Sequence, residues 1–466
     1  MSQRHTHSSQ LGLALVASSL LVTAARAQPE YDPDVCTAGD CGQVGCLEAG
    51  KLPELLPPHP PLRGEPALLG SYPDFDYWSL DTSGVRDTAG LMHFAVRLWE
   101  YNNQTPNYDR YAMDTQGNVM ETWLDWLGVG GMPAFTDANG HNHFVRPVAT
   151  TQYFGVVDSA DHVHAFYTML ADTGWEVVYT QFDENGNTVI DWTQITVGAG
   201  PWNWYLQPVV TSDDKLIVSW IRDTEDLCAV SSDDGGYTWS DITVLFDSNP
   251  AIQHSMLKTV VGADDSLHLV WRTLDWSTYQ ETLRYVKLRS DWSVAVGESI
   301  FHMGPGWYPF VSLDNRGDLH VTFGTIYDTA TSLSYTRLRG DLDLGGAPAS
   351  DELLTSIPEM SFVTDVDTVR YPVNLPDENG RVHVIYEEGE YGRETDKDVY
   401  YVVLCSLIGD LDCDDTVNLS DLAALLAAYG TCAGDPDYRG VADLDGNGCV
   451  ELADLAALLA NYGAGG

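Results

Sequence analysis

The sequence has few cationic side chains. Its 466 residues include 23 Lys and Arg against 68 Asp and Glu, which gives a formal net charge of −45 at pH 7. A chain this acidic is repelled by nucleic acid and by anionic membrane surfaces, so we expect neither as a partner. Beyond the first 27 residues the chain also lacks any apolar run of about 18 residues, the length that a transmembrane helix needs. We therefore expect no membrane span.

A short apolar run lies near the N-terminus, from Leu11 to Ala25. It ends in Ala25-Arg26-Ala27, which has the small-x-small pattern of a secretory cleavage site. The run is too short to cross a bilayer comfortably. We predict that residues 1–27 are a signal peptide and that the mature protein is secreted. The eight cysteines fit an oxidising compartment, where we expect disulfides, with a connectivity that the sequence leaves open.

One β pattern recurs between residues 76 and 404. A short strand, often begun by proline, runs into an Asp/Gly turn, and a second strand with an apolar-His-apolar sequence follows. The equivalent positions in the copies are His93, His164, Ile217, His268, His320 and His383. A spacing near fifty residues with β alternation is typical of four-stranded propeller blades. We predict a mainly β fold, a six-bladed β-propeller, or a seven-bladed one if the long first interval hides another copy.

The recurrent His lies in mid-strand between apolar neighbours. We expect it to pack between blades with hydrogen-bonded ring nitrogens, because equivalent positions on different blades are too far apart to share a metal. A further motif, S-x-D-x-G-x-T-W, is formed by residues 232–239. It is the Asp-box turn, and with the repeats it makes this region resemble the sialidase-like, Asp-box (BNR) β-propellers. The Asp-box is a structural turn, so the resemblance implies a fold and leaves the chemistry open.

Near the C-terminus one acidic loop occurs twice, the second copy 33 residues after the first. Oxygen-bearing side chains stand at loop positions 1, 3, 5, 9 and 12, a pattern that lets a tightly curved loop surround Ca²⁺ while position 7 offers its carbonyl. Each loop runs into a near-identical apolar helix. We predict two bound Ca²⁺ ions. The ligands of the first are Asp410, Asp412, Asp414, Thr416, Asn418 and Asp421, and those of the second are Asp443, Asp445, Asn447, Cys449, Glu451 and Asp454.

The duplicated loop and helix resemble a type I dockerin, the module that docks secreted polysaccharide-degrading enzymes onto cohesin domains. The resemblance implies a cohesin-like partner. Asp415 departs from the pattern, since Gly is usual at position 6, and positions 10 and 11 are Leu-Ser and Leu-Ala instead of hydroxyl pairs. The predicted organisation is a signal peptide at 1–27, a Cys-containing, Pro-rich leader at 28–75, the propeller at 76–404 and a dockerin-like domain at 405–466.

The repeat also predicts where a ligand could bind. The start of each first strand and the end of each second strand should meet on the face opposite the Asp/Gly hairpins. Five arginines fall there and are predicted to bind substrate: Arg97, Arg146, Arg222, Arg272 and Arg370. Because Arg binds carboxylate or sulfate through paired hydrogen bonds, the predicted ligand is an anionic glycan, such as a uronate, a sulfated sugar or sialic acid. The alternative is that these arginines form structural bridges to neighbouring Asp and Glu.

Catalytic residues are less well defined. The F/Y-R-I-P signature of sialidases is absent, so sialidase roles are not carried over. A lyase would use His or Tyr to move protons, and the candidates on the same face are His254, Tyr308 and Tyr371. We predict a secreted polysaccharide-degrading enzyme, a hydrolase or a lyase. A non-catalytic glycan-binding propeller and a scaffold or adhesion protein are the alternatives.

Overall fold

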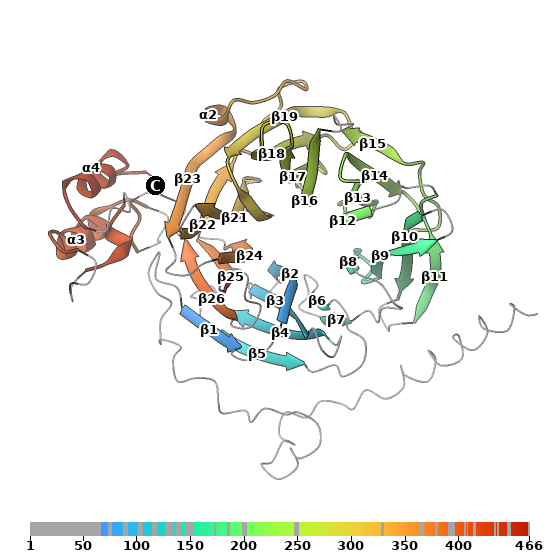
Figure 1. Cartoon of the computed structure of the whole chain (residues 1–466), viewed down its shortest axis with the longest axis horizontal. Helices are drawn as coiled ribbons and strands as arrows, with labels where there is room; N and C mark the ends of the chain where they lie inside the picture. Colours follow the sequence, from blue (N-terminus) through green and yellow to red (C-terminus); the bar gives the residue numbers. More distant parts are fainter. Residues whose placement is uncertain are drawn as a thin grey trace, which may run out of the picture. The chain divides into compact units, whose positions relative to one another are not determined.

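The computed structural model of the chain is mainly β (Figure 1). The chain divides into two compact units, and every element below belongs to the larger one, residues 55–184 and 188–466. The predicted signal peptide and the leader up to residue 66 lie outside the described residues. Those are 67–72, 77–86, 92–100, 106–113, 119–125, 134–136, 142–144, 153–171, 174–183, 187–197, 203–246, 251–327, 330–363, 368–377, 381–389, 397–404, 407, 409–412, 416–432, 435, 438–444 and 449–464.

Within these ranges the strands form six four-stranded antiparallel sheets and one two-stranded sheet. Each four-stranded sheet is a meander of neighbouring strands. The first five are β2 (Tyr77–Arg86), β3 (Met92–Glu100), β4 (Pro106–Met113) and β5 (Val119–Asp125); β8 (Tyr153–Val157), β9 (Val163–Ala171), β10 (Gly174–Phe182) and β11 (Thr188–Gln194); β12 (Asn203–Val210), β13 (Leu216–Arg222), β14 (Asp226–Ser232) and β15 (Thr243–Phe246); β16 (Ile252–Val261), β17 (Leu267–Asp275), β18 (Gln280–Leu288) and β19 (Val294–Met303); and β20 (Gly306–Leu313), β21 (Leu319–Tyr327), β22 (Ala330–Leu338) and β23 (Thr355–Val363). The two-stranded sheet is β6 (Ala134–Thr136) and β7 (Asn142–Phe144), and a short helix, α2 (Asp351–Leu354), precedes β23.

The last sheet combines distant parts of the chain. Its strands β24 (Thr368–Pro376), β25 (Val382–Gly389) and β26 (Lys397–Leu404) are completed by β1 (Ala67–Tyr72), which pairs antiparallel with β26 so that Ala67 lies opposite Tyr401. Strand β1 falls inside the segment predicted to be a leader, and the sequence pattern did not predict it. Because β1 pairs with the edge of β26, the final sheet has four strands like the other five.

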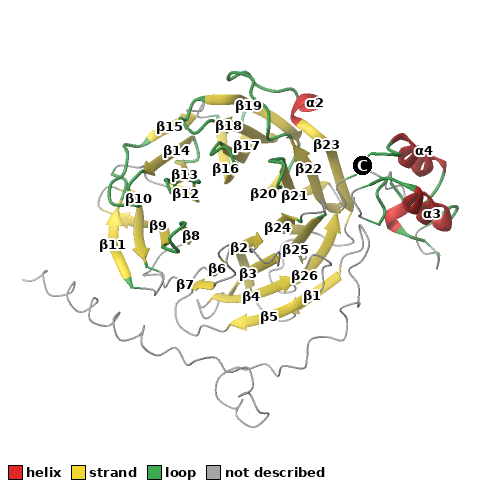
Figure 2. Ribbon diagram, turned by 180° about the vertical axis from the view of Figure 1, so that it is seen from behind, coloured by secondary structure: helices red, strands yellow, loops and turns green. Residues whose placement is uncertain are grey.

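From the second sheet to the last, and from the last sheet to the first, neighbouring sheets pack through their first strands. Strand β12 contacts β8 and β16, β16 contacts β20, and β24 contacts both β20 and β2 (Figures 1 and 2). The side chains between neighbouring sheets are large and fully buried. Among them are the residues three positions after the recurrent marker, Trp220, Trp271, Phe323 and Tyr386. Four-stranded meanders stacked face to face around their first strands form a propeller-type fold.

The register predicted from the repeat is confirmed. All six marker residues are the second residue of the second strand of their sheet, in β3, β9, β13, β17, β21 and β25. The pattern located these residues because, in each copy, a turn is followed by an alternating strand with the marker at the same place.

The recurrent His is buried with hydrogen-bonded ring nitrogens, as expected, and its Tyr and Asp partners are a finding of the structure. Its Nδ1 lies 2.6–2.9 Å from a Tyr hydroxyl of the third strand in four sheets. The pairs are His164–Tyr179, His268–Tyr285, His320–Tyr335 and His383–Tyr401. Nε2 faces the Asp six residues earlier in three of them, at 3.2, 3.4 and 3.6 Å. Because a carboxylate only accepts, Nε2 carries the proton and the Tyr hydroxyl donates to Nδ1.

The Asp-box forms the turn between β14 and β15. Asp234 accepts from the Ser232 hydroxyl at 2.8 Å and from both the amide and the hydroxyl of Thr238, at 2.8 and 2.6 Å. Gly236 has φ +95°, and a Cβ there would meet the Tyr179 hydroxyl at 2.1 Å. Glycine is therefore required by the neighbouring sheet as well as by the turn.

The C-terminal region contains two short helices, α3 (Leu419–Ala428) and α4 (Leu452–Ala460), with a 3₁₀ turn, η1 (Gly440–Ala442), between them. Their shared core includes Val417, Leu425, Val450 and Leu458. A disulfide joins Cys432 to Cys449. Among the described residues no helix is long and apolar enough to cross a membrane.

Candidate functional site

Four consecutive first strands carry the same β-bulge near their starts. The strand pairing shifts register there in β12, β16, β20 and β24. In each bulge one residue has a positive φ, and none of these residues is glycine: Tyr205 (58°), Met256 (57°), Tyr308 (53°) and Tyr371 (48°). Such a conformation costs about 1–3 kcal/mol per residue and concentrates at functional sites. A bulge also turns a side chain out of the ordinary strand alternation.

The bulges bring residues of three successive sheets together. The Tyr308 amide lies 3.1 Å from Met256 Sδ, and the ring centroids of Tyr308 and Tyr371 are 4.1 Å apart. Both tyrosines were predicted as candidate catalytic residues, and the structure places them in contact. They lie at the starts of β20 and β24, the ends opposite the first hairpins of those sheets.

The Tyr371 side chain is partly buried, and its environment raises the pKa of the phenol well above the ordinary value. Burial is the main cause, followed by the neighbouring Tyr308 and the Glu387 carboxylate. The phenol therefore stays protonated at neutral pH, and it can donate a hydrogen bond or a proton. Glu387 is itself buried and lies opposite Arg370 in the β24–β25 register.

Arg370 is half-buried at the start of β24, next to Tyr371. No ion pair joins it to another residue of the part of the chain that the structure describes. It is thus the predicted arginine best able to receive an anionic ligand beside the tyrosine pair.

Arg272 is held internally. Its side chain is 8% exposed, and Nε and Nη2 lie 2.9 and 2.8 Å from the same oxygen of Glu281. Nη1 donates to the Ser255 hydroxyl at 3.2 Å, and the guanidinium lies 4.4 Å from the ring centroid of Trp307. The structural-bridge alternative therefore describes Arg272, which ties β17 to β18 and to the first strand of the next sheet.

Arg222 is also bridged, through Nε and Nη2 to one oxygen of Asp226 across the β13–β14 turn. Arg97 lies on β3 opposite Asp81, and its side chain is outside the described residues. Arg146 lies outside them as well. The structure therefore brings only Arg370, of the five predicted arginines, to the tyrosine pair within the described residues.

His254 does not join the tyrosines. Its ring packs against Trp271, with centroids 6.1 Å apart, and its amide donates to the Thr224 carbonyl of the preceding sheet at 2.7 Å. Burial and the nearby Arg284 lower its pKa to about 4, so the imidazole is neutral at pH 7. Neither ring nitrogen has a hydrogen-bond partner among the described residues.

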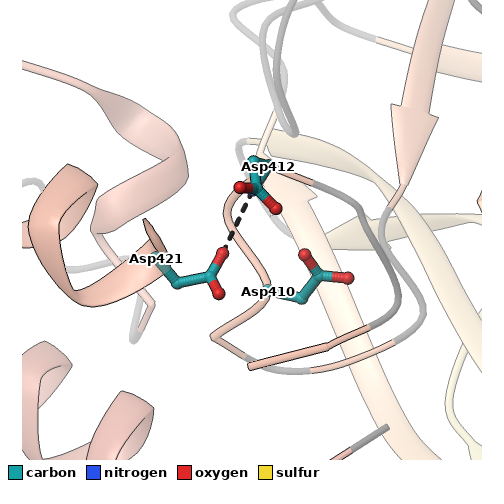
Figure 3. A group of neighbouring side chains, drawn as sticks. All are labelled: Asp410, Asp412 and Asp421. Carbon is teal, nitrogen blue, oxygen red and sulfur yellow. Dashed lines mark hydrogen bonds between the residues drawn. The ribbon is translucent and has the colours of Figure 1, made fainter. Parts of the chain in front are cut away.

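The first acidic loop places three of its predicted ligands together. One carboxylate oxygen from each of Asp410, Asp412 and Asp421 lies within 4.8 Å of the others. Figure 3 shows the three side chains around a common space, with the Asp412 amide donating to Asp421 at 3.2 Å. Three carboxylate oxygens at this spacing fit the donor set of Ca²⁺.

The two loops have the same closing geometry. Asp421 Oδ1 accepts from the Leu411 amide at 2.6 Å, and Asp454 Oδ1 accepts from the Leu444 amide at 2.6 Å. The second oxygen of each Asp accepts from the amide of loop position 9, in both cases at 2.7 Å. Thr416, Asn418, Asp443, Cys449 and Glu451 are described, whereas Asp414, Asp445 and Asn447 lie outside the described residues. The Cys449 thiol is in the disulfide, which leaves its carbonyl for position 7.

Comparison with known proteins gives no match to a protein-family model and no match to a curated protein. Among solved structures, a protein of unknown function from Dyadobacter fermentans is 9% identical with a TM-score of 0.47, covering 73% of this chain and 99% of that one. An ulvan lyase of a polysaccharide lyase family is 10% identical with a TM-score of 0.40, covering 73% and 87%. The NanB sialidase of Streptococcus pneumoniae is 10% identical with a TM-score of 0.43, covering 72% and 70%. At these values the likeness carries no argument about chemistry.

Proposed function

We propose that the chain is a secreted carbohydrate-active enzyme that degrades an anionic glycan, and that it carries a calcium-binding, dockerin-like module. The observation that carries the proposal is the contact between Tyr308 and Tyr371 at two bulges, beside Arg370 and Glu387. A cation, a protonated phenol that can donate a hydrogen bond and a buried carboxylate then lie on the same face of neighbouring sheets, which is a suitable set for binding and cleaving an acidic sugar chain.

The residues take separate roles in this proposal. Arg370 binds a carboxylate or sulfate group of the glycan through its guanidinium. Tyr371, whose raised pKa keeps it protonated, donates a hydrogen bond to the oxygen of the bond that breaks. Tyr308 positions the Tyr371 ring by direct contact, and the buried Glu387 carboxylate lies near the phenol. Hydrolase and lyase chemistry both remain within this arrangement.

The test is incubation with a panel of neutral, uronic and sulfated polysaccharides. An unsaturated product identifies a lyase, and new reducing ends without unsaturation identify a hydrolase. Retention without cleavage would favour the alternative of a non-catalytic glycan-binding propeller. In the active case, Arg370→Ala and Tyr371→Phe should each abolish most of the turnover, while Arg289→Ala, in an exposed pair with Asp343, should leave it unchanged. No binding and no cleavage across the panel would refute the proposal.

The β region is proposed to be a six-bladed propeller spanning residues 76–404, closed by β1. The support is the presence of six four-stranded sheets, each with a marker residue on its second strand. The pair β6–β7 lies between the first two of these sheets in the sequence and counts as an insertion in this interpretation.

The C-terminal module, residues 405–466, is proposed to bind two Ca²⁺ ions and to dock onto a cohesin-like protein. Matching loop geometry and the Asp410–Asp412–Asp421 group support the metal sites. When bound, Ca²⁺ neutralises the loop carboxylates and couples their geometry to folding. The docking surface is supported by equivalent apolar side chains exposed on both helices: Leu419 and Leu452, Leu426 and Leu459, and Tyr429 and Tyr462. The disulfide supports a secreted location.

A further inference from the structure

The hairpin between β17 and β18 presents two aromatic side chains to solvent. Trp276 is 53% exposed and Tyr279 is 76% exposed, and their ring centroids lie 6.2 Å apart in an edge-to-face arrangement. Neither residue is part of the inter-sheet core. Single exposed apolar side chains are common on protein surfaces, whereas adjacent ones such as these are a feature of ligand-binding surfaces.

The backbone beneath the pair is well fixed. The Trp276 amide donates to the Ala251 carbonyl just before β16, at 2.9 Å. Asp275 Oδ1 accepts from the Ser277 amide at 2.7 Å and from its hydroxyl at 2.6 Å. Tyr279 has φ 56°, a conformation that costs energy for a non-glycine residue. Two rings on an anchored turn are held ready to bind, so little conformational entropy is lost when a ligand covers them.

The hairpin lies on the same face as the candidate site. Strand β17 ends three residues after Arg272, and the hairpin follows directly. At about 3.4 Å per residue, the hairpin therefore begins roughly 10 Å along the strand from Arg272. Arg272 contacts Glu281, at the start of β18, and Trp307, which precedes Tyr308. These contacts connect the start of β18, directly after the hairpin, to the residue that precedes Tyr308.

The size and charge of the pair limit the occupant. A stable protein interface needs about 800 Å² from each partner, much more than two rings flanked by Ser, Thr and Asp can offer. A sugar ring, with an apolar face and polar edges, is matched in size to an exposed Trp–Tyr pair, whose rings have the same apolar body and polar tip. Hydrogen bonds to Ser277 hold the pKa of Asp275 below its ordinary value, so this neighbour stays anionic and disfavours a carboxylate or sulfate.

We propose that Trp276 and Tyr279 form an outer subsite that stacks against an uncharged sugar residue of the same polysaccharide whose anionic group binds at Arg370. The inference rests on the proposed function and adds a substrate class to it: a glycan that alternates acidic and neutral sugars and is bound over several units. A ligand that reaches only the tyrosine pair does not need the hairpin.

The experiment is affinity electrophoresis of the full chain in gels that contain either hyaluronan, which alternates a uronate with a neutral sugar, or polygalacturonate, which is acidic throughout. Trp276→Ala should weaken retention by hyaluronan about threefold to tenfold, the equilibrium equivalent of one aromatic contact. Retention by polygalacturonate should change little. Tyr279→Gly should have a similar effect on hyaluronan, and glycine accepts the φ of 56° at this position, so a folding defect is not expected.

The matched control is Tyr237→Ala. Tyr237 is 67% exposed on the Asp-box turn, which follows Ser232 opposite Leu216 and so lies on the face of the first hairpins. Its loss should leave both retentions unchanged. If the unaltered chain is retained and Trp276→Ala matches it in hyaluronan, the outer subsite is refuted while the proposed function stands. If the unaltered chain is retained by neither glycan and cleaves none of the polysaccharide panel, the proposed function fails and the subsite fails with it.

Discussion

The guanidinium of Arg272 lies 4.4 Å from the ring centroid of Trp307, a residue of the next sheet. The same guanidinium is paired with Glu281 of its own sheet. Arg272, which the repeat places among the substrate-binding residues, therefore links two neighbouring sheets. Because Trp307 immediately precedes Tyr308, the contact between Arg272 and Trp307 also helps to fix the bulge that directs Tyr308 toward Tyr371.

The first prediction concerns the contribution of the Arg272–Glu281 ion pair to stability. Arg272→Ala leaves the Glu281 carboxylate without its partner in a mostly buried place, and should lower the free energy of unfolding by about 3 kcal/mol. Arg289→Ala removes an exposed pair with Asp343 and should cost much less, because solvent screens exposed ion pairs. Urea denaturation of the two variants measures both values. Equal losses would mean that the Arg272 pair is no stronger than a surface pair.

The second prediction concerns acid. Burial lowers the pKa of His268 to about 3 and also lowers the pKa values of His164 and His320. These histidines therefore bind protons less readily in the folded state than in the unfolded state. Folding is most favourable above the unfolded pKa of about 6.5, and the free energy of unfolding decreases as the pH falls below that value. Each such His should contribute a slope of up to about 1.4 kcal/mol per pH unit. Denaturation midpoints between pH 7 and pH 4 should show it, and His268→Gln should reduce the slope.

The third prediction concerns backbone strain. Thr224 has φ 64° in the turn between β13 and β14, a conformation that a β-branched residue adopts at a cost. Thr224→Gly should raise the free energy of unfolding by about 1 kcal/mol, while the carbonyl that accepts from His254 is retained. A change in the opposite sense, from glycine to a residue with a Cβ, is Gly235→Ala. Gly235 has φ +72° and no atom near its Cβ position, so this change should lower the free energy of unfolding by a similar amount. Opposite signs in thermal denaturation are the expected result.

The fourth prediction concerns calcium. Chelation should unfold the two loops and α3–α4 in the full chain, since the clustered carboxylates then repel one another. Hydrogen exchange over residues 416–464 should rise, and added Ca²⁺ at about 100 times its dissociation constant should restore about 2.7 kcal/mol. Asp421→Ala should remove the response of the first loop, whereas Asp435→Asn, outside both loops, should preserve it. Exchange that is unchanged by chelator would contradict the metal sites.

Much of the fold could be predicted because its repeated signals are local. Turn residues followed by alternation identified all six second strands, with His164, Ile217 and His320 each at the same place in its strand. The Tyr partners of the recurrent His stood in the sequence too, 15 to 18 residues later, and a search at that spacing could have found them. Strand β1 carried no such signal, because its partner is at the far end of the β region.

The candidate site was harder to predict. The repeat located Tyr308 and Tyr371, but their contact depends on bulges whose positive φ falls on Tyr and Met, residues that do not indicate that conformation in a sequence. Arg272 meets Glu281 across the β17–β18 hairpin, whose position and register the repeat did not give. Which arginines were free to bind a ligand depended on these neighbours.

The pairing of β1 with β26 has a consequence for the order of events during synthesis. Strand β1 leaves the ribosome long before Tyr401, the residue that lies opposite Ala67, has been added. Until then its edge has no partner within the last sheet, and that sheet must be completed through one of the most distant contacts in the chain. The β region can therefore finish folding only after residue 404 has been made.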